Sequence, residues 1–186
     1  MDKLIDDLIK LAFAEDIGDG DHTTLCCIPE TAMGKSQLII KEDGVLAGVE
    51  MAKRIFHDFD PELKMTVFIQ DGAEVKKGDI AFVVEGKIQS LLQTERLMLN
   101  VMQRMSGIAT TTRKYAKALE GTKTHVLDTR KTTPGMRMIE KEAVRIGGGM
   151  NHRIGLFDMI LLKDNHVDFA GGIEQAITLS LIHISE

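Results

Sequence analysis

The sequence predicts an α/β protein built from two parts. In residues 1–105, helical and strand-like patterns alternate irregularly between tight glycine turns, which is typical of an α+β domain. From residue 123 the expected order is strand, loop, helix, loop, strand, the pattern of a parallel α/β unit. We therefore expect an α+β domain over residues 1–105 and the beginning of a parallel α/β domain over residues 106–186.

The first part has a regular succession of expected elements. Apolar side chains recur at helical spacing in residues 2–14, 49–59 and 88–105. Short apolar or alternating runs predict strands at residues 36–41, 63–69 and 80–84. Ser106 and Gly107 are expected to end the long third helix, and another helix is expected over residues 108–119.

In the second part, two short apolar runs each end at cationic side chains. Residues 125–127 read as a buried strand followed by DTRK, and residues 159–162 as a strand followed by KDNH. Residues 147–153 lie between them as a glycine-rich loop, interpreted as a flexible helix end, that carries the triplet NHR. Because α/β barrels build their sites at the carboxyl ends of strands, three such clusters favour a site for an anionic substrate. For any single cation, a solvated charged face is the alternative.

The charge distribution also favours a small anion. The net charge is -5, but residues 1–95 hold ten Lys/Arg against nineteen Asp/Glu, whereas residues 96–166 hold thirteen against six. A basic block in an acidic chain indicates a focused anion site. With no Trp and one Tyr, nucleic-acid binding is not expected.

Membrane association and secretion are not expected either. The sequence has no apolar run of about 18 residues, and the acidic N-terminus lacks the order of a signal peptide. Cys26 and Cys27 are adjacent and have no metal-binding spacing, so we expect buried, reduced thiols in a cytoplasmic protein.

The sequence gives weaker signals for three other functions. Residues 71–84 resemble the hairpin of lipoyl or biotinyl carrier domains, with Lys76 and Lys77 beside Gly78, and a purely structural turn is the alternative. Residues 147–149 do not match the pattern GxGxxG and do not directly follow an expected strand, which disfavours a dinucleotide-binding loop. No Ser–His–Asp order is evident, which disfavours acyl transfer.

Several longer motifs occur together and in order. They lie at residues 15–16, 20–24, 44–48, 94–96, 99–100, 106–110, 128–135 (DTRKTTPG), 147–149, 151–153 and 162–166. Over roughly residues 3–178 the chain resembles the quinolinate phosphoribosyltransferases, also called carboxylating nicotinate-nucleotide pyrophosphorylases.

This resemblance implies a fold and a reaction. The fold is an N-terminal α/β sandwich followed by an open α/β barrel. The reaction is that of a pentosyltransferase in NAD biosynthesis: quinolinate and 5-phosphoribosyl 1-pyrophosphate give nicotinate mononucleotide, pyrophosphate and CO₂. Mg²⁺ is implied as cofactor, with its ligands beyond the end of this chain or on the substrate. A homodimer with shared active sites is implied, and a higher oligomer is possible.

The same resemblance implies the site residues, and no metal ligand among them. By motif match the substrate-binding residues are Arg96, Thr129, Arg130, Lys131, His152, Arg153 and Lys163, of which Lys131 and Lys163 are also implied to be catalytic. Arg96 is implied to reach the neighbouring subunit's site. The rival within the same fold family is a protein that acts on another anionic pyridine or in molybdenum uptake.

We also expect the chain to be a fragment of such an enzyme. The family's barrel continues for several more strands, so residues 106–186 correspond to an incomplete barrel, and the fragment is expected to be inactive. Residues 179–186, LSLIHISE, depart from the family pattern, which leaves native sequence and a cloning scar as alternatives.

Overall fold

The computed structural model describes residues 2–182 and confirms the predicted α/β class. In chain order the elements are α1 (Asp2–Ile17), α2 (His22–Cys27), β1 (Met33–Ile39), β2 (Gly44–Val45), α3 (Val49–Phe59), β3 (Lys64–Val67), β4 (Glu74–Val75), β5 (Ile80–Lys87), α4 (Ile88–Ala118), α5 (Arg137–Ile146), α6 (Asp164–Ala170) and α7 (Ile173–Ile182). The chain forms two compact units, residues 1–151 and residues 152–186.

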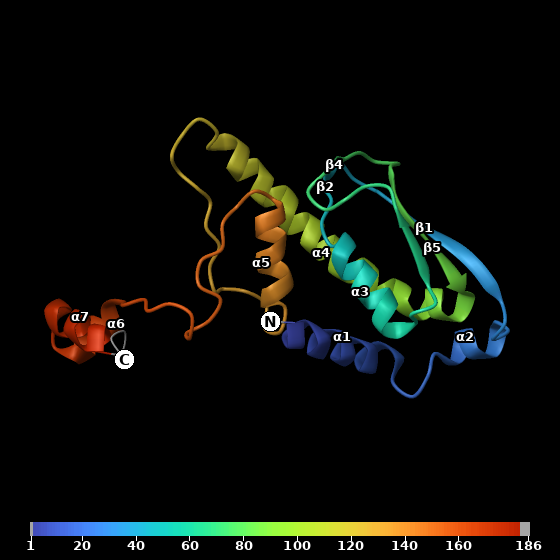
Figure 1. Cartoon of the computed structure of the whole chain (residues 1–186), viewed down its shortest axis with the longest axis horizontal. Helices are drawn as coiled ribbons and strands as arrows, with labels where there is room; N and C mark the ends of the chain where they lie inside the picture. The colour runs from blue at the N-terminus through green and yellow to red at the C-terminus, as the bar shows by residue number, and fades with distance from the viewer. Residues whose placement is uncertain (1, 183–186) are drawn as a thin grey trace. The chain divides into compact units, whose positions relative to one another are not determined.

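The first unit is organised around a small antiparallel sheet in the order β1-β5-β3. Helices α3 and α4 lie side by side and pack against it (Figure 1). The Phe56 ring on α3 meets the Phe82 ring on β5 edge-on, with 6.3 Å between centroids. Ile55, Phe82 and Met105 are almost completely buried, so residues far apart in the sequence share one core.

Helix α4 continues through the expected break at Ser106 and Gly107, so that expectation was wrong. Ser106 Oγ accepts a hydrogen bond from the Ala47 amide at 3.0 Å and donates one to the Ala47 carbonyl at 3.1 Å. Its hydroxyl therefore bonds to another segment and does not compete for its own helix backbone. Tertiary contacts here override the weak helix propensity of Ser and Gly.

Residues 71–84 do not form the paired hairpin of a carrier domain. Strand β4 pairs with β2, whereas β5 pairs with β1 and β3, so the two ends of the segment belong to different sheets. The Asp79 amide donates to the Lys76 carbonyl at 3.1 Å and closes a tight turn there. The structural alternative for Lys76 and Lys77 is therefore favoured.

Neither expected strand of the second part is a regular strand. Leu127 makes one isolated parallel bridge, to Met150, while residues 159–162 have no strand structure. Ile160 and Leu161 are exposed. A parallel strand needs neighbours to satisfy its backbone and cover its side chains, and sequence pattern alone does not supply them.

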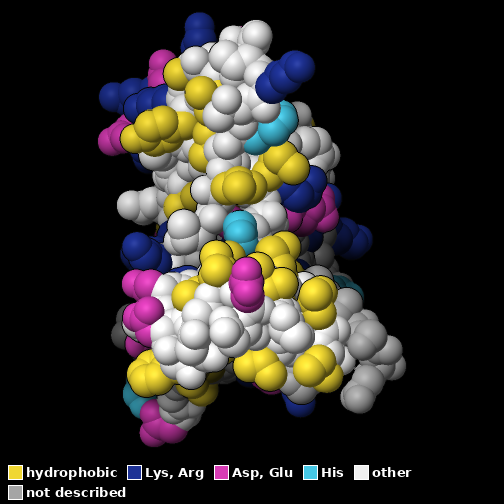
Figure 2. All heavy atoms as spheres, turned by 90° about the vertical axis from the view of Figure 1, so that its left-hand side faces the viewer, with side chains coloured by type: hydrophobic (Ala, Val, Ile, Leu, Met, Phe, Trp, Pro, Cys, Tyr) yellow, Lys and Arg dark blue, Asp and Glu magenta, His cyan; other side chains and the backbone are white. Residues whose placement is uncertain are grey.

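The second unit has a largely exposed apolar surface in its described part, residues 152–182. Ala176, 4% exposed, is the one buried hydrophobic residue of that part. Many exposed hydrophobic side chains are visible on the face in Figure 2. In residues 152–182 the exposed large hydrophobic residues include Leu156, Phe157, Phe169, Ile173 and Leu179.

Two further expectations concern the two cysteines and the last residues of the sequence. Cys26 and Cys27 are exposed free thiols rather than buried ones. Of the residues in question as a cloning scar, 179–182 belong to α7, and 183–186 lie outside the described residues.

Candidate active site

Three of the expected site residues share one loop. Thr129, Arg130 and Lys131 follow the bridge residue Leu127 and precede α5. The Lys131 amide donates to Thr129 Oγ1 at 3.1 Å, which tightens the loop at this point. Thr129 and Lys131 are exposed and Arg130 is half-buried. The sequence thus presents a polar hydroxyl, a guanidinium and an ammonium in succession.

Side chains from the first turn of α5 hold this loop. Arg137 Nε donates to Thr132 Oγ1 at 3.0 Å, and its Nη2 to the Arg130 carbonyl at 3.5 Å. Glu140 accepts the Thr133 amide at 3.3 Å. Residues three apart on a helix lie on one face, so α5 turns a row of polar side chains toward the loop.

Helix α4 contributes a further contact through Arg104. Its Nε donates to Glu140 Oε1 at 2.9 Å, and its Nη2 to Thr133 Oγ1 at 2.5 Å. Glu140 is 8% exposed, and a buried charge is costly unless it has partners. Arg104 and the Thr133 amide are the partners here. This arrangement links the loop to both helices.

A buried ion pair lies at the base of the loop. Lys141 Nζ lies 2.5 Å from Asp128 Oδ1, and the two side chains are 2% and 7% exposed. With its amide oriented to satisfy both neighbours, Asn151 donates to Asp128 Oδ2 at 2.8 Å and to the Lys141 carbonyl at 2.9 Å. Asp128 thus accepts side-chain hydrogen bonds on both oxygens.

These contacts divide the cations of the region into two kinds. Arg104 and Lys141 are neutralised by acidic partners. The Arg130 and Lys131 side chains form no ion pair with residues 2–182, and the buried Arg130 Nε has no acceptor there. Since buried donors in proteins are normally satisfied, the unpartnered Nε makes Arg130 a candidate for binding an anion. Uncompensated positive charge is therefore concentrated at residues 130–131.

Arg96 lies away from this loop within its own chain. It is exposed on α4, and its side chain makes no hydrogen bond or ion pair with the described residues. It precedes Arg104, which contacts the loop, by eight residues, about 12 Å along the helix axis. An arginine side chain is too short to cover that distance easily.

The remaining expected residues belong to the second unit. His152 Nδ1 accepts the Arg153 amide at 2.8 Å, and Arg153, 7% exposed, donates from Nη1 to the Met159 carbonyl at 3.2 Å. Lys163 is exposed and is the N-cap residue of α6; its amide donates to His166 Nδ1 at 3.0 Å. The structure thus groups residues 129–131 in one unit and residues 152–153 in the other.

Asp158 shapes the backbone that follows Arg153. Its carboxylate accepts the amides of Ile154 at 2.7 Å and Gly155 at 2.8 Å. The Ile154 hydrogen bond is the main cause that holds the pKa of Asp158 below its ordinary value, followed by the Gly155 hydrogen bond. The carboxylate therefore stays ionised and fixes the turn.

Sequence reasoning missed most of the supporting side chains. It did not single out a role for the residues that hold the loop, namely Arg104, Asp128, Arg137, Glu140, Lys141 and Asn151. The signal was partly available, since Arg137, Glu140 and Lys141 are spaced for one helical face. Their partners in the loop depend on tertiary structure.

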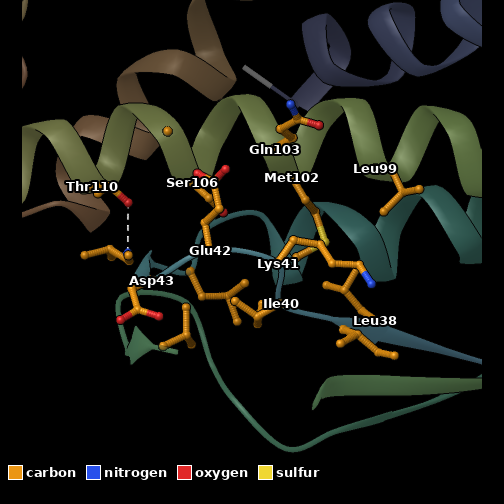
Figure 3. Close-up of a pocket in the computed structure, with 16 residues that line it drawn as sticks. Leu38, Ile40, Lys41, Glu42, Asp43, Leu99, Met102, Gln103, Ser106 and Thr110 are labelled. Atoms are coloured by element: carbon orange, nitrogen blue, oxygen red, sulfur yellow. Dashed lines mark hydrogen bonds between the residues drawn. The ribbon is translucent and has the colours of Figure 1, made fainter. Parts of the chain in front are cut away.

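A separate groove of about 550 Å³ lies between α4 and the loop after β1 (Figure 3). Apolar side chains such as Leu38, Ile40 and Met102 line much of it. Thr110 Oγ1 accepts the Val45 amide at 2.8 Å and so fixes β2 to the helix. None of the expected site residues lines this groove.

Two kinds of feature are absent from residues 2–182. Residues 2–182 contain no group of three or more His, Cys, Asp or Glu side chains placed to hold a metal ion. No helix in the same range has the length and apolarity needed to cross a bilayer.

Comparison with known proteins first defines the class of this α/β fold and its cationic loop. The chain matches the crystal structure of NadC from Streptococcus pyogenes with a TM-score of 0.92 at 40% identity, over 99% of this chain and 65% of that one. The nicotinate-nucleotide pyrophosphorylase from Francisella tularensis matches with a TM-score of 0.91 at 38% identity, over 100% and 66%.

Sequence comparison then identifies the family. Residues 21–106 match the N-terminal domain of quinolinate phosphoribosyl transferase, and residues 108–181 match its C-terminal domain. The chain therefore belongs to the quinolinate phosphoribosyl transferase family, and the expected resemblance is confirmed.

Curated relatives agree with that assignment. Quinolinate phosphoribosyltransferase [decarboxylating] 1 of Nicotiana glauca is 48% identical over 171 residues, 91% of this chain and 48% of the relative. A probable nicotinate-nucleotide pyrophosphorylase of a Synechocystis species is 43% identical over 94% of this chain and 59% of its own length. The chain thus spans about half the length of its Nicotiana relative.

Proposed function

We propose that this chain is part of an enzyme that transfers a phosphoribosyl group from 5-phosphoribosyl 1-pyrophosphate to quinolinate, with decarboxylation to nicotinate mononucleotide. The observation that carries the proposal is the loop of residues 129–131. It concentrates uncompensated positive charge, and the buried Arg130 Nε has no acceptor among the described residues. Family membership supplies the substrate class for that charge.

The residue types suit a substrate with two adjacent carboxylates. A guanidinium binds a carboxylate through two parallel hydrogen bonds, and an ammonium supplies a compact charge beside it. In the proposed site Arg130 and Lys131 bind the quinolinate carboxylates, and Thr129 adds a hydroxyl contact. By motif match with the family, His152, Arg153 and Lys163 are proposed as further substrate-binding residues.

In this reaction the protein mainly positions the substrates and stabilises charge. As the bond from the anomeric carbon to pyrophosphate breaks, negative charge grows on the leaving group, and a cation such as Lys131 stabilises it. By motif match Lys163 is proposed for the same role. The pyridine nitrogen takes up the sugar and becomes cationic. That ring accepts the electrons released when CO₂ departs, so no covalent protein nucleophile is required.

Mg²⁺ remains an expectation for this reaction. The described residues offer no cluster of metal ligands, so the ion would be held on the phosphates of the sugar donor or by residues outside this chain. The expected cytoplasmic location stays a prediction; an Arabidopsis thaliana relative is named as chloroplastic and a tobacco relative as mitochondrial.

Arg96 is proposed to serve a second subunit. Its exposure, its lack of a described partner and its distance along α4 from the loop all favour a contact made outside its own chain. We accordingly propose a homodimer in which each site takes Arg96 from the other subunit.

Quinolinate binding to the 186-residue chain tests the central proposal. We expect Arg130→Ala or Lys131→Ala to weaken binding by about 1.5–3 kcal/mol each, because each removes a charge-assisted contact. Nicotinate, with one carboxylate, should bind much more weakly than quinolinate. Isothermal titration calorimetry measures both. Arg145→Ala, which removes a cation paired with Glu142 on the exposed face of α5, is the control and should leave binding unchanged. Equal affinity for the two ligands would contradict the proposal.

A further inference from the structure

The base of the cationic loop contains the most deeply buried ion pair of the described chain. Lys141 and Asp128 are 2% and 7% exposed in their side chains, whereas the other ion pairs each have at least one more exposed partner. Removing two charges from water is expensive, and well-packed apolar residues often serve stability as well or better. Stability alone therefore does not explain a buried pair at this position.

The pair connects segments that lead to both groups of cations. Asp128 immediately precedes Thr129, and Asn151 immediately precedes His152. Leu127 and Met150, the residues just before Asp128 and Asn151, form the parallel bridge. Asp128 Oδ1 is held by Lys141 from α5 and Oδ2 by Asn151. One carboxylate thus fixes two backbone segments and a helix at the start of the loop.

The direction of the chain makes this anchor relevant to Arg130. Only Thr129 separates the fixed Asp128 from Arg130, and the Arg130 carbonyl is held in turn by Arg137. The guanidinium therefore begins from a backbone that is constrained on both sides. A displacement of about 1 Å at such a site can cost a large factor in function, because bidentate contacts need both oxygens in register.

We propose that Asp128, Lys141 and Asn151 are positioning residues that orient Arg130 and Lys131 for a dianionic ligand. They touch no substrate themselves. Their role rests on the proposed function of the loop, and it predicts a specific loss: the preference for two carboxylates over one falls when the anchor is removed.

Two variants on α5 separate this role from a change in charge. Lys141 and Arg145 both lie on α5, and Lys141→Met and Arg145→Met each remove one cation and its ion pair, with Asp128 and with Glu142 respectively. We expect Lys141→Met to lower quinolinate affinity about tenfold, the scale on which loss of supporting contacts acts, and to leave nicotinate affinity nearly unchanged. Arg145→Met should change neither. Lys141→Arg, which keeps the charge, should retain most of the preference.

Hydrogen exchange of the backbone amides at residues 128–131 supplies a readout that needs no ligand. Lys141→Met should accelerate exchange there and leave residues 80–87 in β5 protected. Asn151→Ala keeps the Lys141–Asp128 ion pair, so we expect it to disturb folding less than Lys141→Met does. It should change exchange and ligand preference in the same direction by a smaller factor.

The outcomes distinguish failure of this inference from failure of the proposed function. If the unaltered chain binds no quinolinate, the proposed function fails, and exchange at residues 128–131 alone decides whether the anchor positions the loop. Unchanged exchange in Lys141→Met and Asn151→Ala overturns the inference. Where quinolinate does bind, an equal fall in affinity for quinolinate and nicotinate also overturns the inference, because a loss of folded protein lowers both affinities equally. Faster exchange at residues 128–131 with an unchanged preference for quinolinate overturns it as well.

Discussion

One hydroxyl group, that of Ser90, lowers the pKa of the Asp60 carboxyl. Ser90 Oγ donates to Asp60 Oδ2 at 2.6 Å, and the Glu62 amide donates to Asp60 Oδ1 at 3.0 Å. The Ser90 hydrogen bond is the main cause that lowers the pKa of Asp60 from its ordinary value of 3.8. Asp60 is the C-cap of α3, so this contact joins the end of α3 to the first turn of α4.

We expect Ser90→Ala to reduce the free energy of unfolding at pH 7 by about 1 kcal/mol, because a hydrogen bond to an ionised group is lost. A lowered folded-state pKa stabilises above the unfolded value and ceases to do so as the pH falls through the folded value. The difference between Ser90→Ala and the unaltered chain should therefore shrink as the pH drops well below 3.8. Urea unfolding across this range measures it.

Ser180→Ala is the control for that experiment. The Ser180 hydroxyl donates to the Ile177 carbonyl, which does not titrate. Its effect on the free energy of unfolding should be the same at neutral and acidic pH. A constant difference for Ser90→Ala would show that the contact with Asp60 does not depend on ionisation.

At the scale of elements, the packing of α5 on α4 depends on a glycine run that the sequence pattern misrepresents. Residues 147–149 read as a flexible helix end. A Cβ on Gly147, however, would lie 2.6 Å from the Ala109 carbonyl oxygen and 2.7 Å from Thr112 Cβ. Arg113 Nε donates to the Gly147 carbonyl at 3.0 Å and caps the helix end. Gly147 allows close approach, which only the tertiary structure reveals.

Gly147→Ala should accordingly lower the free energy of unfolding by about 2 kcal/mol, the usual cost of overpacking a closed contact. Gly107→Ala is the matched control, because Gly107 lies in the middle of α4 with open space around it. We expect Gly107→Ala to stabilise the chain by about 0.5–1 kcal/mol through the backbone entropy of the unfolded state. Thermal or urea unfolding of both variants gives the two signs, and equal signs would contradict this account.

At the scale of the whole molecule, the sequence pattern predicted individual helices and strands but not how they pair. The helix at residues 49–59 and the strand core at residues 80–84 were anticipated because burial on one face or throughout leaves a clear pattern. The pairing of β4 with β2 was not, since it joins residues about 30 apart in the sequence. Likewise, the cations of residues 129–131 were visible in the sequence, whereas the ion pairs that neutralise Arg104 and Lys141 were not.

The proposed dimer gives a prediction at this scale. In a mixture of Arg96→Ala and Lys131→Ala chains, each mixed dimer should contain one site with both changes and one site with neither. With random assortment, about a quarter of all sites should regain tight quinolinate binding, as two-fold symmetry requires. Calorimetry of the mixture against each variant alone measures this fraction. Verified mixed dimers without a tight class of sites would mean that Arg96 does not act across subunits.

The continuity of helix α4 restricts where chains of this family can gain or lose residues. The two family regions, residues 21–106 and 108–181, meet inside this 31-residue helix rather than at a flexible linker. Inserting one residue at the junction would rotate everything beyond it by about 100° and shift it by about 1.5 Å. Arg104 would then no longer share a helical register with Thr110 and Arg113. Insertions and deletions should therefore be tolerated in surface turns such as residues 119–124 and selected against at residues 106–108.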